Sequence, residues 1–510
     1  MSPANREFEL KLSLTGDELD RLAEKPEFGG EAGERSRKEL KSIYFDTPDN
    51  RLRDKGIALR VRDEGKGFVQ TVKMETRLQD GLSNPIEIED RVESLEPDTG
   101  RIGDRHVREL VLDAVEGSTL AKVFETVVTR TTHRLQRGHT TVELALDKGE
   151  ARAKGRRSEI CEAELELIEG DADDLLDIAQ SLFSKCPFQL SSESKAERGY
   201  RLLLDVPESK RVAPAHAEKP KVDRGQTSGQ AFAEIFRSAR DQIVKNRSVV
   251  LQTDEPEGAH QLRVGLTRLR SAHRALKSFM DNRVLREMED DARALSHAAG
   301  QLRDADVMIA DIYAPVAGAP PGKPGFDELH EALQAHRAAA QSDARAALQG
   351  EHWSRLLLSL TLWPHMLERD PALEQPIEDY ASKALQKRWK KVAESGRRLE
   401  ALDDAGQHKM RRSLKKLRYM LEFFEPVFDA DAACAFVKRL KKLQDVFGYV
   451  NDVRMAAQLR SICAERCRGG PDPSFAAGYV CGRHDGAASE VWKKAPKEWR
   501  RLKSLTRFWQ

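Results

Sequence analysis

The apolar residues of this chain follow two different periods. Up to residue 207, short runs alternate between apolar and charged side chains, which is typical of β-strands with one buried face. From Thr227 onwards the segments are long, rich in Ala, Leu, Arg and Glu, and helical in period. With 510 residues the chain is also too long for one ordinary core. We therefore predict a strand-rich domain over residues 1–207, a proline-containing linker over 208–221, and an all-helical domain over 222–510.

The strand-rich half contains recognisable strands and helices. The alternating runs predict strands over residues 7–14, 57–62, 68–73, 86–92, 142–146 and 161–168. Helical patterns occur near residues 15–22, 107–112 and 173–183. The fold class expected for the whole chain is therefore α+β, with an all-α domain following a sheet.

Several of these strands have one charged face. Residues i and i+2 share a face, so Glu162, Glu164 and Glu166 point the same way, as do Arg60 and Arg62. A charged face in water is the usual explanation. Three adjacent glutamates repel one another, however, unless cations lie among them. A closed or nearly closed barrel with acidic and basic strands interleaved provides those cations. It would bind Mg2+ or Mn2+ through carboxylates and phosphate through lysine and arginine, as phosphoryl transfer requires.

At these residues the sequence resembles the CYTH family, also called triphosphate tunnel metalloenzymes. The resemblance covers about 200 residues. Its motifs, in order, are Glu7-Phe-Glu9-Leu-Lys11, Tyr44-Phe-Asp46-Thr-Pro48, Leu59-Arg60-Val-Arg62, Thr71-Val-Lys73, Arg130, Arg134, Asp147, Glu162-Ala-Glu164-Leu-Glu166 and Ser194-Lys195. It implies an eight-stranded antiparallel tunnel with covering helices. Such a tunnel binds a triphosphate with cations and a metal ion with carboxylates.

The resemblance also implies a role for individual residues. The implied catalytic residues are Glu7, Glu9 and Lys11. The implied metal ligands are Glu7, Glu9, Asp147, Glu162 and Glu164. The implied substrate contacts are Lys11, Arg60, Arg62, Lys73, Arg130, Arg134 and Lys195. A glycine-containing insertion over residues 77–84 precedes Glu87 and Glu89, and these two glutamates receive no role.

The helical half contains an internal repeat. Residues 260–270 align with residues 408–418 at an offset of 148, and the same offset relates Leu295 to Leu443, Gly300 to Gly448, Leu302 to Val450 and Asp304 to Asp452. One offset maintained over about 45 residues indicates a duplication. We therefore expect two similar helical bundles joined near residues 365–380.

Each copy has a basic helix face. The first basic stripe is His260, Arg263, Thr267, Arg270 and Arg274, and the second is His408, Arg411, Lys415 and Arg418. A solvated face is the usual explanation of such a run. Here, almost no carboxylates lie four residues away to pair with the cations, and the pattern recurs, which favours a polyanionic ligand. Because Thr267 interrupts the first stripe, we expect that stripe to bind more weakly.

The helical half resembles the CHAD family over roughly residues 222–510. The matching motifs are His260-x-x-Arg263, Leu302-Arg303-Asp304-Ala-Asp306-Val, His408-x-x-Arg411 to Leu417-Arg418-Tyr419, and Leu443-Gln444-Asp445 to Asn451-Asp452. The resemblance implies that long-chain inorganic polyphosphate binds along a basic surface between the two bundles. The implied contacts are His260, Arg263, Arg270, Arg274, His408, Arg411, Lys415 and Arg418.

Charge and composition narrow the choice of partners. The net charge of +1 combines about −9 over residues 1–220 with about +10 over residues 221–510. The basic stripes lack interleaved aromatic residues, so nucleic acid is not the expected ligand. The sequence shows no secretory signal and no membrane span, and its 6 cysteines include no CxxC pair. We therefore expect a cytoplasmic protein with reduced thiols. The CHAD resemblance adds an expected association with polyphosphate granules.

The leading functional hypothesis is metal-dependent hydrolysis of inorganic triphosphate to phosphate and pyrophosphate, with polyphosphate held by the helical domain. One alternative is a CYTH enzyme that acts on thiamine triphosphate or a nucleoside triphosphate. The other is a non-catalytic polyphosphate-binding scaffold. The intact set of carboxylates favours the enzyme, since a pure anion binder has no use for them.

Overall fold

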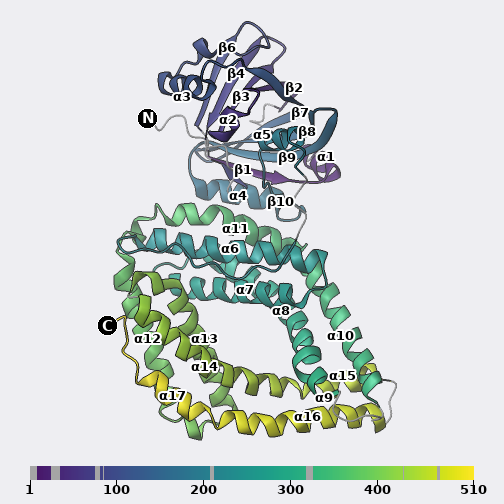
Figure 1. The fold of residues 1–510 in the computed structure, drawn as a ribbon, viewed down its shortest axis with the longest axis vertical. Helices are drawn as coiled ribbons and strands as arrows, with labels where there is room; N and C mark the ends of the chain where they lie inside the picture. The colour runs from purple at the N-terminus through teal and green to yellow at the C-terminus, as the bar shows by residue number, and fades with distance from the viewer. Residues whose placement is uncertain are drawn as a thin grey trace. The chain divides into compact units, whose positions relative to one another are not determined.

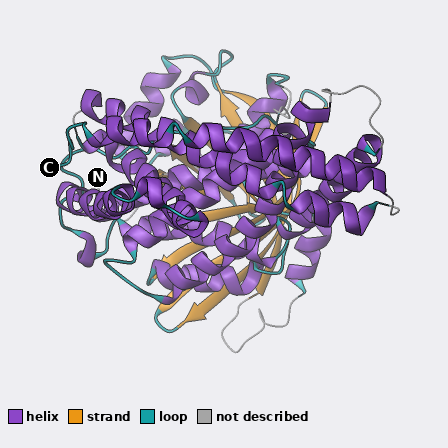
Figure 2. Ribbon diagram, turned by 90° about the horizontal axis from the view of Figure 1, so that it is seen from below, coloured by secondary structure: helices purple, strands orange, loops and turns teal. Residues whose placement is uncertain are grey.

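The computed structural model describes residues 8–24, 35–74, 81–83, 86–206, 212–317, 325–428, 430–467 and 471–510. The chain forms two compact units, Met1–Arg211 and Val212–Gln510. Every strand named below belongs to the first unit, and the described part of the second unit is helical (Figures 1 and 2). No described helix has the length and apolar character needed to cross a membrane.

One antiparallel sheet forms the first unit. Its strands follow the order β10, β1, β9, β8, β7, β2, β3, β4, β6, and β5 pairs with β1 outside this order. Their bounds are β1 Phe8–Ser13, β2 Arg35–Asp46, β3 Ile57–Asp63, β4 Phe68–Met74, β5 Leu82–Ser83, β6 Ile86–Val92, β7 Ala121–Arg137, β8 Thr140–Ala153, β9 Arg156–Glu169 and β10 Gln189–Leu190. Nine strands therefore lie along the order, and the expected number of eight is wrong. The short β10, with only two residues, accounts for the difference.

The segment from β5 to β6 closes this sheet into a tunnel. β5 pairs with β1 through Leu82 and Ser83, whereas β6 pairs with β4 along its whole length. Only two residues separate β5 from β6, so β1, next to one end of the strand order, is linked to β6 at the other end. Gly81 directly precedes β5 and has a φ of +80°, and a Cβ atom there would lie 2.9 Å from the Lys11 carbonyl oxygen. Glycine permits both the positive φ and the close approach.

Helices cover the apolar outer face of the sheet. They are α1 Gly16–Ala23, α2 Arg51–Asp54, α3 Arg105–Val115 and α4 Ala172–Phe183. A fifth helix, α5 Lys195–Leu203, lies on the cavity side of the sheet, where Lys195 and Ala196 line the wall. Val107 and Val111 of α3 belong to one buried apolar cluster with Val61 of β3 and Ile88 of β6. The strands and helices expected from the sequence are present in the described residues, but β2 and β7 were missing from that prediction.

The second unit repeats its helices. Their bounds are α6 Ser228–Gln252, α7 Pro256–Leu276, α8 Arg283–Val307, η4 Met308–Tyr313, α9 Ala314–Ala317, α10 Phe326–Ala347, α11 Glu351–Leu367, α12 Ile377–Gly396, α13 Asp404–Phe424, α14 Ala430–Met455, α15 Gln458–Arg466, α16 Pro471–Trp492 and α17 Ala495–Lys503. Both ends of α7 and α13 differ by 148 residues, the offset found in the sequence. The second bundle begins after the loop between α11 and α12, near the expected junction.

The segment before α6 packs on the helical unit. The Asn246 side chain donates a hydrogen bond to the Ala215 carbonyl oxygen at 2.8 Å and accepts one from the Ala215 N–H at 3.1 Å. The Ser238 hydroxyl donates to the Glu218 carbonyl oxygen, and Val222 is fully buried. Residues 212–221, which the sequence predicts as linker, therefore have fixed partners on α6.

Candidate active site

The tunnel encloses a cavity of about 240 Å3 whose wall is mostly charged. Its charged lining residues are Glu9, Lys11, Arg60, Arg62, Lys73, Glu87, Glu89, Arg130, Glu143, Glu164, Glu166 and Lys195. They come from seven strands and from α5, because alternate residues of each strand point inward in a closed sheet. All of the predicted substrate contacts except Arg134 thus lie in one cavity.

Lys195 lies at the centre of the first charged group. Its Nζ atom is 2.6 Å from Glu164 Oε1, 2.8 Å from Asp147 Oδ2 and 3.0 Å from Glu162 Oε2. Arg130 binds two of the same carboxylates, with Nη2 at 2.6 Å from Asp147 Oδ2 and 2.5 Å from Glu164 Oε2. A second lysine, Lys11, lies 2.9 Å from Glu164 and 3.0 Å from Glu9.

These groups keep one another charged. Burial alone would lower the pKa of Lys11 and Lys195, but the neighbouring carboxylates raise both pKa values above the ordinary range. Burial would likewise raise the pKa of Glu164, yet Lys11, Lys195 and Arg130 hold that pKa well below its ordinary value. The first group is therefore ionised at neutral pH, with each charge compensated by a neighbour.

A second charged group joins β3, β4 and β6. Arg60 Nη2 lies 3.2 Å from Glu87 Oε1 and 3.7 Å from Glu89 Oε1. Lys73 forms an ion pair with Glu87, and the Thr71 hydroxyl donates a hydrogen bond to Glu89 at 3.1 Å. The two glutamates that received no role from the sequence therefore orient two of the predicted substrate contacts.

Arg62 is the uncompensated cation of the cavity. Within the described chain it forms no ion pair, and its Nε donates only a long hydrogen bond of 3.4 Å to the Ser42 hydroxyl. The positive charge of Arg60, together with burial and Arg130, lowers the pKa of Arg62 to about 10. Because this guanidinium stays charged at neutral pH, the part of the cavity wall around Arg62 is positive, and an anion can bind there.

A third group consists of three carboxylates, of which Glu9 also pairs with Lys11. Glu166 on β9 faces Glu9 on β1 and Glu143 on β8 in the strand register. Burial, followed by the charges of Glu9 and Glu143, raises the pKa of Glu166 to about 7. Neither Glu143 nor Glu166 forms a hydrogen bond or ion pair with any described residue. Their oxygens are the donors that Mg2+ and Mn2+ prefer, so this group fits a divalent cation.

The structure separates the predicted metal ligands. Glu9 and Glu164 line the cavity, whereas Asp147 and Glu162 are buried behind it and do not. Asp147 is bound by Arg130 and Lys195. Glu162 also accepts a hydrogen bond from Arg198 at 2.9 Å. Glu7 lies outside the described residues.

Arg134 was predicted to contact the substrate but lies outside the cavity, and Glu143 lines the cavity without having been predicted. Arg134 is exposed and is not part of the cavity wall, although it stands opposite Glu143 in the strand register. Sequence reasoning missed Glu143 as a lining residue. The only signal for it was its place between Val142 and Leu144, two buried residues that point outward.

Helix α5 brings Lys195 to the cavity. Ser194 caps it by accepting a hydrogen bond from the Glu197 N–H, and the Glu197 carboxylate accepts one from the Ser194 N–H. Further along the helix, the Tyr200 hydroxyl donates a 2.6 Å hydrogen bond to Asp46 Oδ2. A Cβ atom at Gly199 would lie 2.1 Å from the Phe124 ring, so glycine allows the helix to approach the sheet closely.

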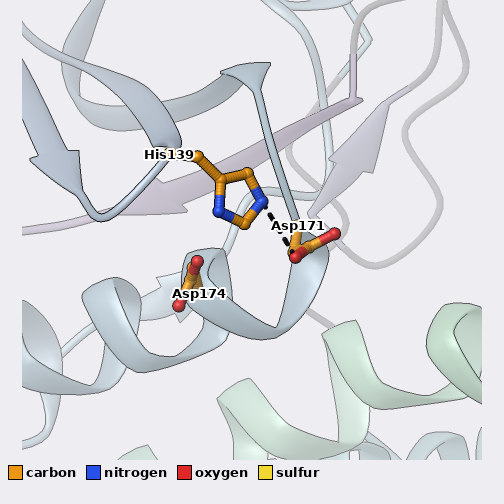
Figure 3. Close-up of side chains that lie close together, drawn as sticks. All are labelled: His139, Asp171 and Asp174. Carbon is orange, nitrogen blue, oxygen red and sulfur yellow. Dashed lines mark ion pairs between the residues drawn. The ribbon is translucent and has the colours of Figure 1, made fainter.

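One carboxylate–histidine cluster lies away from this cavity. His139 Nε2 is 3.1 Å from Asp171 Oδ2, and Asp174 is nearby (Figure 3). Asp174 already accepts a hydrogen bond from the Thr140 hydroxyl at 2.6 Å and lies 3.4 Å from Arg137 Nε. The His139 and Asp171 side chains are exposed, and no residue of this cluster lines the tunnel.

The second basic stripe lines a cleft in the helical unit. This cleft has a volume of about 530 Å3. Its wall includes Arg411, Lys415 and Arg418 of α13, together with residues of η4 and α14. His408, which begins the stripe, is exposed and does not line the cleft.

The first basic stripe is partly neutralised. Arg263 forms an ion pair with Asp304, and both Nε and Nη2 of Arg270 lie 3.1 Å from Glu289 Oε1. Both carboxylates belong to α8. The sequence of α7 alone suggested that these cations lack acidic partners. In the folded unit that expectation is wrong, because α8 supplies the partners. Burial and then Arg303 lower the pKa of His260, which favours its neutral form.

The two units match two known domain families. Residues 5–200 match the family model of the CYTH domain, and residues 234–461 match that of the CHAD domain. An inorganic triphosphatase of Haemophilus influenzae is 30% identical over 164 residues, which are 32% of this chain and 46% of that protein. The chain thus matches about half the length of this curated relative.

A solved structure resembles the helical unit. The crystal structure of the CHAD domain from the plant Ricinus communis is 25% identical, with a TM-score of 0.52. The likeness covers 58% of this chain and 99% of that domain. Together with the two family matches, it shows that this chain consists of a CYTH domain followed by a CHAD domain.

Proposed function

We propose that the tunnel hydrolyses inorganic triphosphate to phosphate and pyrophosphate with the help of a divalent metal ion. The observation that carries this proposal is the coexistence of uncompensated charges of both signs in one cavity. Arg62 has no carboxylate partner, and Glu143 and Glu166 have no cation partner. A polyphosphate anion together with a divalent cation would satisfy both.

Different residues of the cavity would bind the phosphate and the metal ion. Arg62, with Arg60 and Arg130 beside it, would bind phosphate oxygens and neutralise their charge. Glu9, Glu143 and Glu166 would hold Mg2+ or Mn2+. The bound metal would neutralise further phosphate charge and lower the pKa of a water molecule. Because the cations are held by carboxylates before substrate arrives, little reorganisation is needed during the reaction.

The cavity favours an inorganic substrate over a nucleotide or thiamine triphosphate. Tyr44 is the one aromatic residue of the described cavity wall, and its ring is stacked on Phe124 with 4.4 Å between centroids. No other lining ring is available to stack on a base or a thiazolium. The name of the Haemophilus influenzae relative, an inorganic triphosphatase, supports the same choice.

The helical unit would bind long-chain polyphosphate. The cleft lined by Arg411, Lys415 and Arg418 provides cations in a row along α13. The first stripe would contribute less, because Asp304 and Glu289 already engage Arg263 and Arg270. A scaffold without catalysis is disfavoured, since Glu143 and Glu166 serve no purpose in binding an anion alone.

One assay tests the proposal. Purified full-length protein is incubated with tripolyphosphate, ATP, thiamine triphosphate or long polyphosphate, with Mg2+, Mn2+ or a chelator, and phosphate release is measured. We expect release from tripolyphosphate that requires the metal and exceeds release from the other substrates. Equal or faster release from ATP would reject the inorganic substrate. No release from any triphosphate in the presence of metal would favour the scaffold.

A further inference from the structure

A group of basic side chains in the helical unit has no acidic partner. Arg388 lies on α12, and Arg412 and Lys416 lie one turn apart on α13. Within the described chain these three side chains form no hydrogen bond and no ion pair. No Asp or Glu occurs between Asp404 and Glu422 on α13, so the helix itself offers no compensation.

These cations gather where three helices meet. α13 contacts both α12 and α7, and Figure 1 shows α12 and α13 side by side. Lys416 is half-buried. Burial, and after it the charges of Arg274, Arg388 and Arg412, lower its pKa. The positive groups acting on Lys416 thus come from α7, α12 and α13. Like charges that act on one another repel, and an external anion bound among them would relieve this repulsion.

This group is distinct from the cleft. The cleft is lined by Arg411, Lys415 and Arg418, whereas Arg412 and Lys416 are absent from its wall. Each of the latter two follows a cleft residue by one position, which corresponds to a rotation of about 100° around the helix. The same helix therefore presents basic residues on two neighbouring faces.

Glu289 is the carboxylate that reaches this group. Its Oε1 atom lies 3.1 Å from Arg270 Nη2 and 4.0 Å from Arg274 Nη2. In the second copy the equivalent position, at the offset of 148, is Val437. The second copy therefore lacks this carboxylate, and Arg418, the equivalent of Arg270, lies instead 3.2 Å from Glu422 Oε1 of its own helix.

We propose that the helical unit has a second polyphosphate-binding surface beside the cleft, with Glu289 as an internal competitor at its edge. The surface consists of Arg274, Arg388, Arg412 and Lys416. This inference rests on the proposed polyphosphate binding and identifies where a longer polymer extends beyond the cleft. Inorganic polyphosphate is the occupant because the four residues include no aromatic ring on which a base could stack. A flexible polyanion can also reach cations on three helices at once.

The test compares two charge-neutralising pairs in the full-length protein. Arg412→Gln with Lys416→Gln removes the proposed contacts, and Lys494→Gln with Lys497→Gln makes the same charge change at the start of α17. Binding of a long and a short polyphosphate is titrated at several salt concentrations, and thermal unfolding confirms that each variant folds. We expect the first pair to weaken binding of the long polymer roughly tenfold and to reduce the salt slope by about 2, one unit for each lost contact. Binding of the short polymer, which occupies the cleft alone, should change little.

The variant Glu289→Gln should change the affinity for the long polymer in the opposite direction. It should strengthen binding of the long polymer and steepen the salt slope, because Arg270 and Arg274 are released. A purely structural role of Glu289 gives no such gain.

Three results separate the possibilities. Long-polymer affinity for the Arg412/Lys416 variant equal to that of the Lys494/Lys497 control overturns the second surface. Equally tight binding of an oligonucleotide of matched charge overturns polyphosphate as its ligand. If the unsubstituted protein binds no polyphosphate, the proposed function of the helical unit fails as a whole.

Discussion

The Nζ atom of Lys195 lies 2.6 Å from Glu164 Oε1, and both side chains line the tunnel cavity. They join α5 to β9, two elements that meet only in the folded tunnel. The same ammonium group also binds Asp147 and Glu162, which are buried behind the wall. One lysine thus compensates three carboxylates and sets the charge of this side of the cavity.

Substitution of Lys195 should therefore affect both stability and substrate binding. In Lys195→Met, three carboxylates lose a buried partner, and breaking a buried ion pair costs about 3–5 kcal/mol. We expect a large drop in the melting temperature and a higher KM for tripolyphosphate. The control is Lys148→Met, which removes an exposed ion pair with Asp20 and should change neither quantity measurably. A Lys195→Met protein with unchanged stability would show that Arg130 and Lys11 suffice.

The carboxylates without cation partners should determine the metal requirement. Glu143→Gln and Glu166→Gln keep the size of each side chain but remove an oxygen donor and its charge. We expect each to raise the Mg2+ or Mn2+ concentration needed for half-maximal activity by tenfold or more, with little loss of thermal stability. Glu159→Gln, at an exposed position of β9, is the matched control. If the metal requirement stays the same in both variants, the metal binds elsewhere, and Asp147 and Glu162 become the ligands to test.

Sequence patterns predicted the strands that have one clearly apolar face but missed β2 and β7. The first residues of β2, from Arg35 to Glu39, are mostly exposed, so that part shows no alternation. β7 carries Thr129 and Thr131 on one face, at positions where apolar residues would have marked it as buried. The tunnel cations could be predicted because they belong to short motifs. Glu143 could not, since a single glutamate in a strand is indistinguishable from a solvated one.

The first basic stripe shows a second limit of such reasoning. Spacing along α7 correctly indicated that Arg263 and Arg270 share a face. Their partners Asp304 and Glu289 lie on α8, and helix–helix packing alone brings them into contact. Charge compensation between helices is not encoded in the spacing within one helix. The prediction from the sequence of α7 therefore placed more unpaired positive charge on this stripe than the folded unit has.

His365 should make the helical unit sensitive to acid. Burial, followed by the charge of Arg237, lowers the pKa of His365 to about 4. In the unfolded chain His365 takes up a proton near the ordinary histidine pKa of 6.5, whereas in the folded chain it does so only near pH 4. Stability should therefore fall as the pH drops from about 6.5 to 4. In His365→Gln this part of the dependence should disappear, as measured by urea unfolding at several pH values. If the pH dependence of stability is unchanged in His365→Gln, groups other than His365 cause it.

The two domains should function as separate fragments. A fragment of residues 1–207 should retain triphosphatase activity, and a fragment of residues 222–510 should bind polyphosphate without hydrolysing it. Because Ala215 and Glu218 hydrogen-bond to side chains of α6, a fragment that begins at residue 212 should be more stable than one that begins at 222. Thermal unfolding and phosphate release measure both effects. An insoluble first fragment would show that the domain boundary at residue 207 is wrong.

Polyphosphate binding should depend unequally on the two basic stripes. Each cation that neutralises a phosphate releases condensed counterions, so log affinity falls with log salt in proportion to the contacts made. Arg411 and Arg418 line the cleft, where Arg418 Nε lies 3.2 Å from Glu422 Oε1, whereas both Arg263 and Arg270 are engaged by carboxylates of α8, Asp304 and Glu289. Reversal of Arg411 and Arg418 to Glu should therefore weaken binding more than reversal of Arg263 and Arg270.

The measurement is titration with long-chain polyphosphate at several salt concentrations, and both double variants should flatten the salt slope. The reversals on α7 also leave Asp304 and Glu289 without partners, so the neutral pair Arg263→Gln and Arg270→Gln is needed to separate lost binding from lost stability. Unchanged affinity in both double reversals would make the stripes ordinary solvated faces. A loss confined to the first stripe would mean that polyphosphate displaces Asp304 and Glu289 from their arginines, and that the more compensated stripe is the principal binding surface.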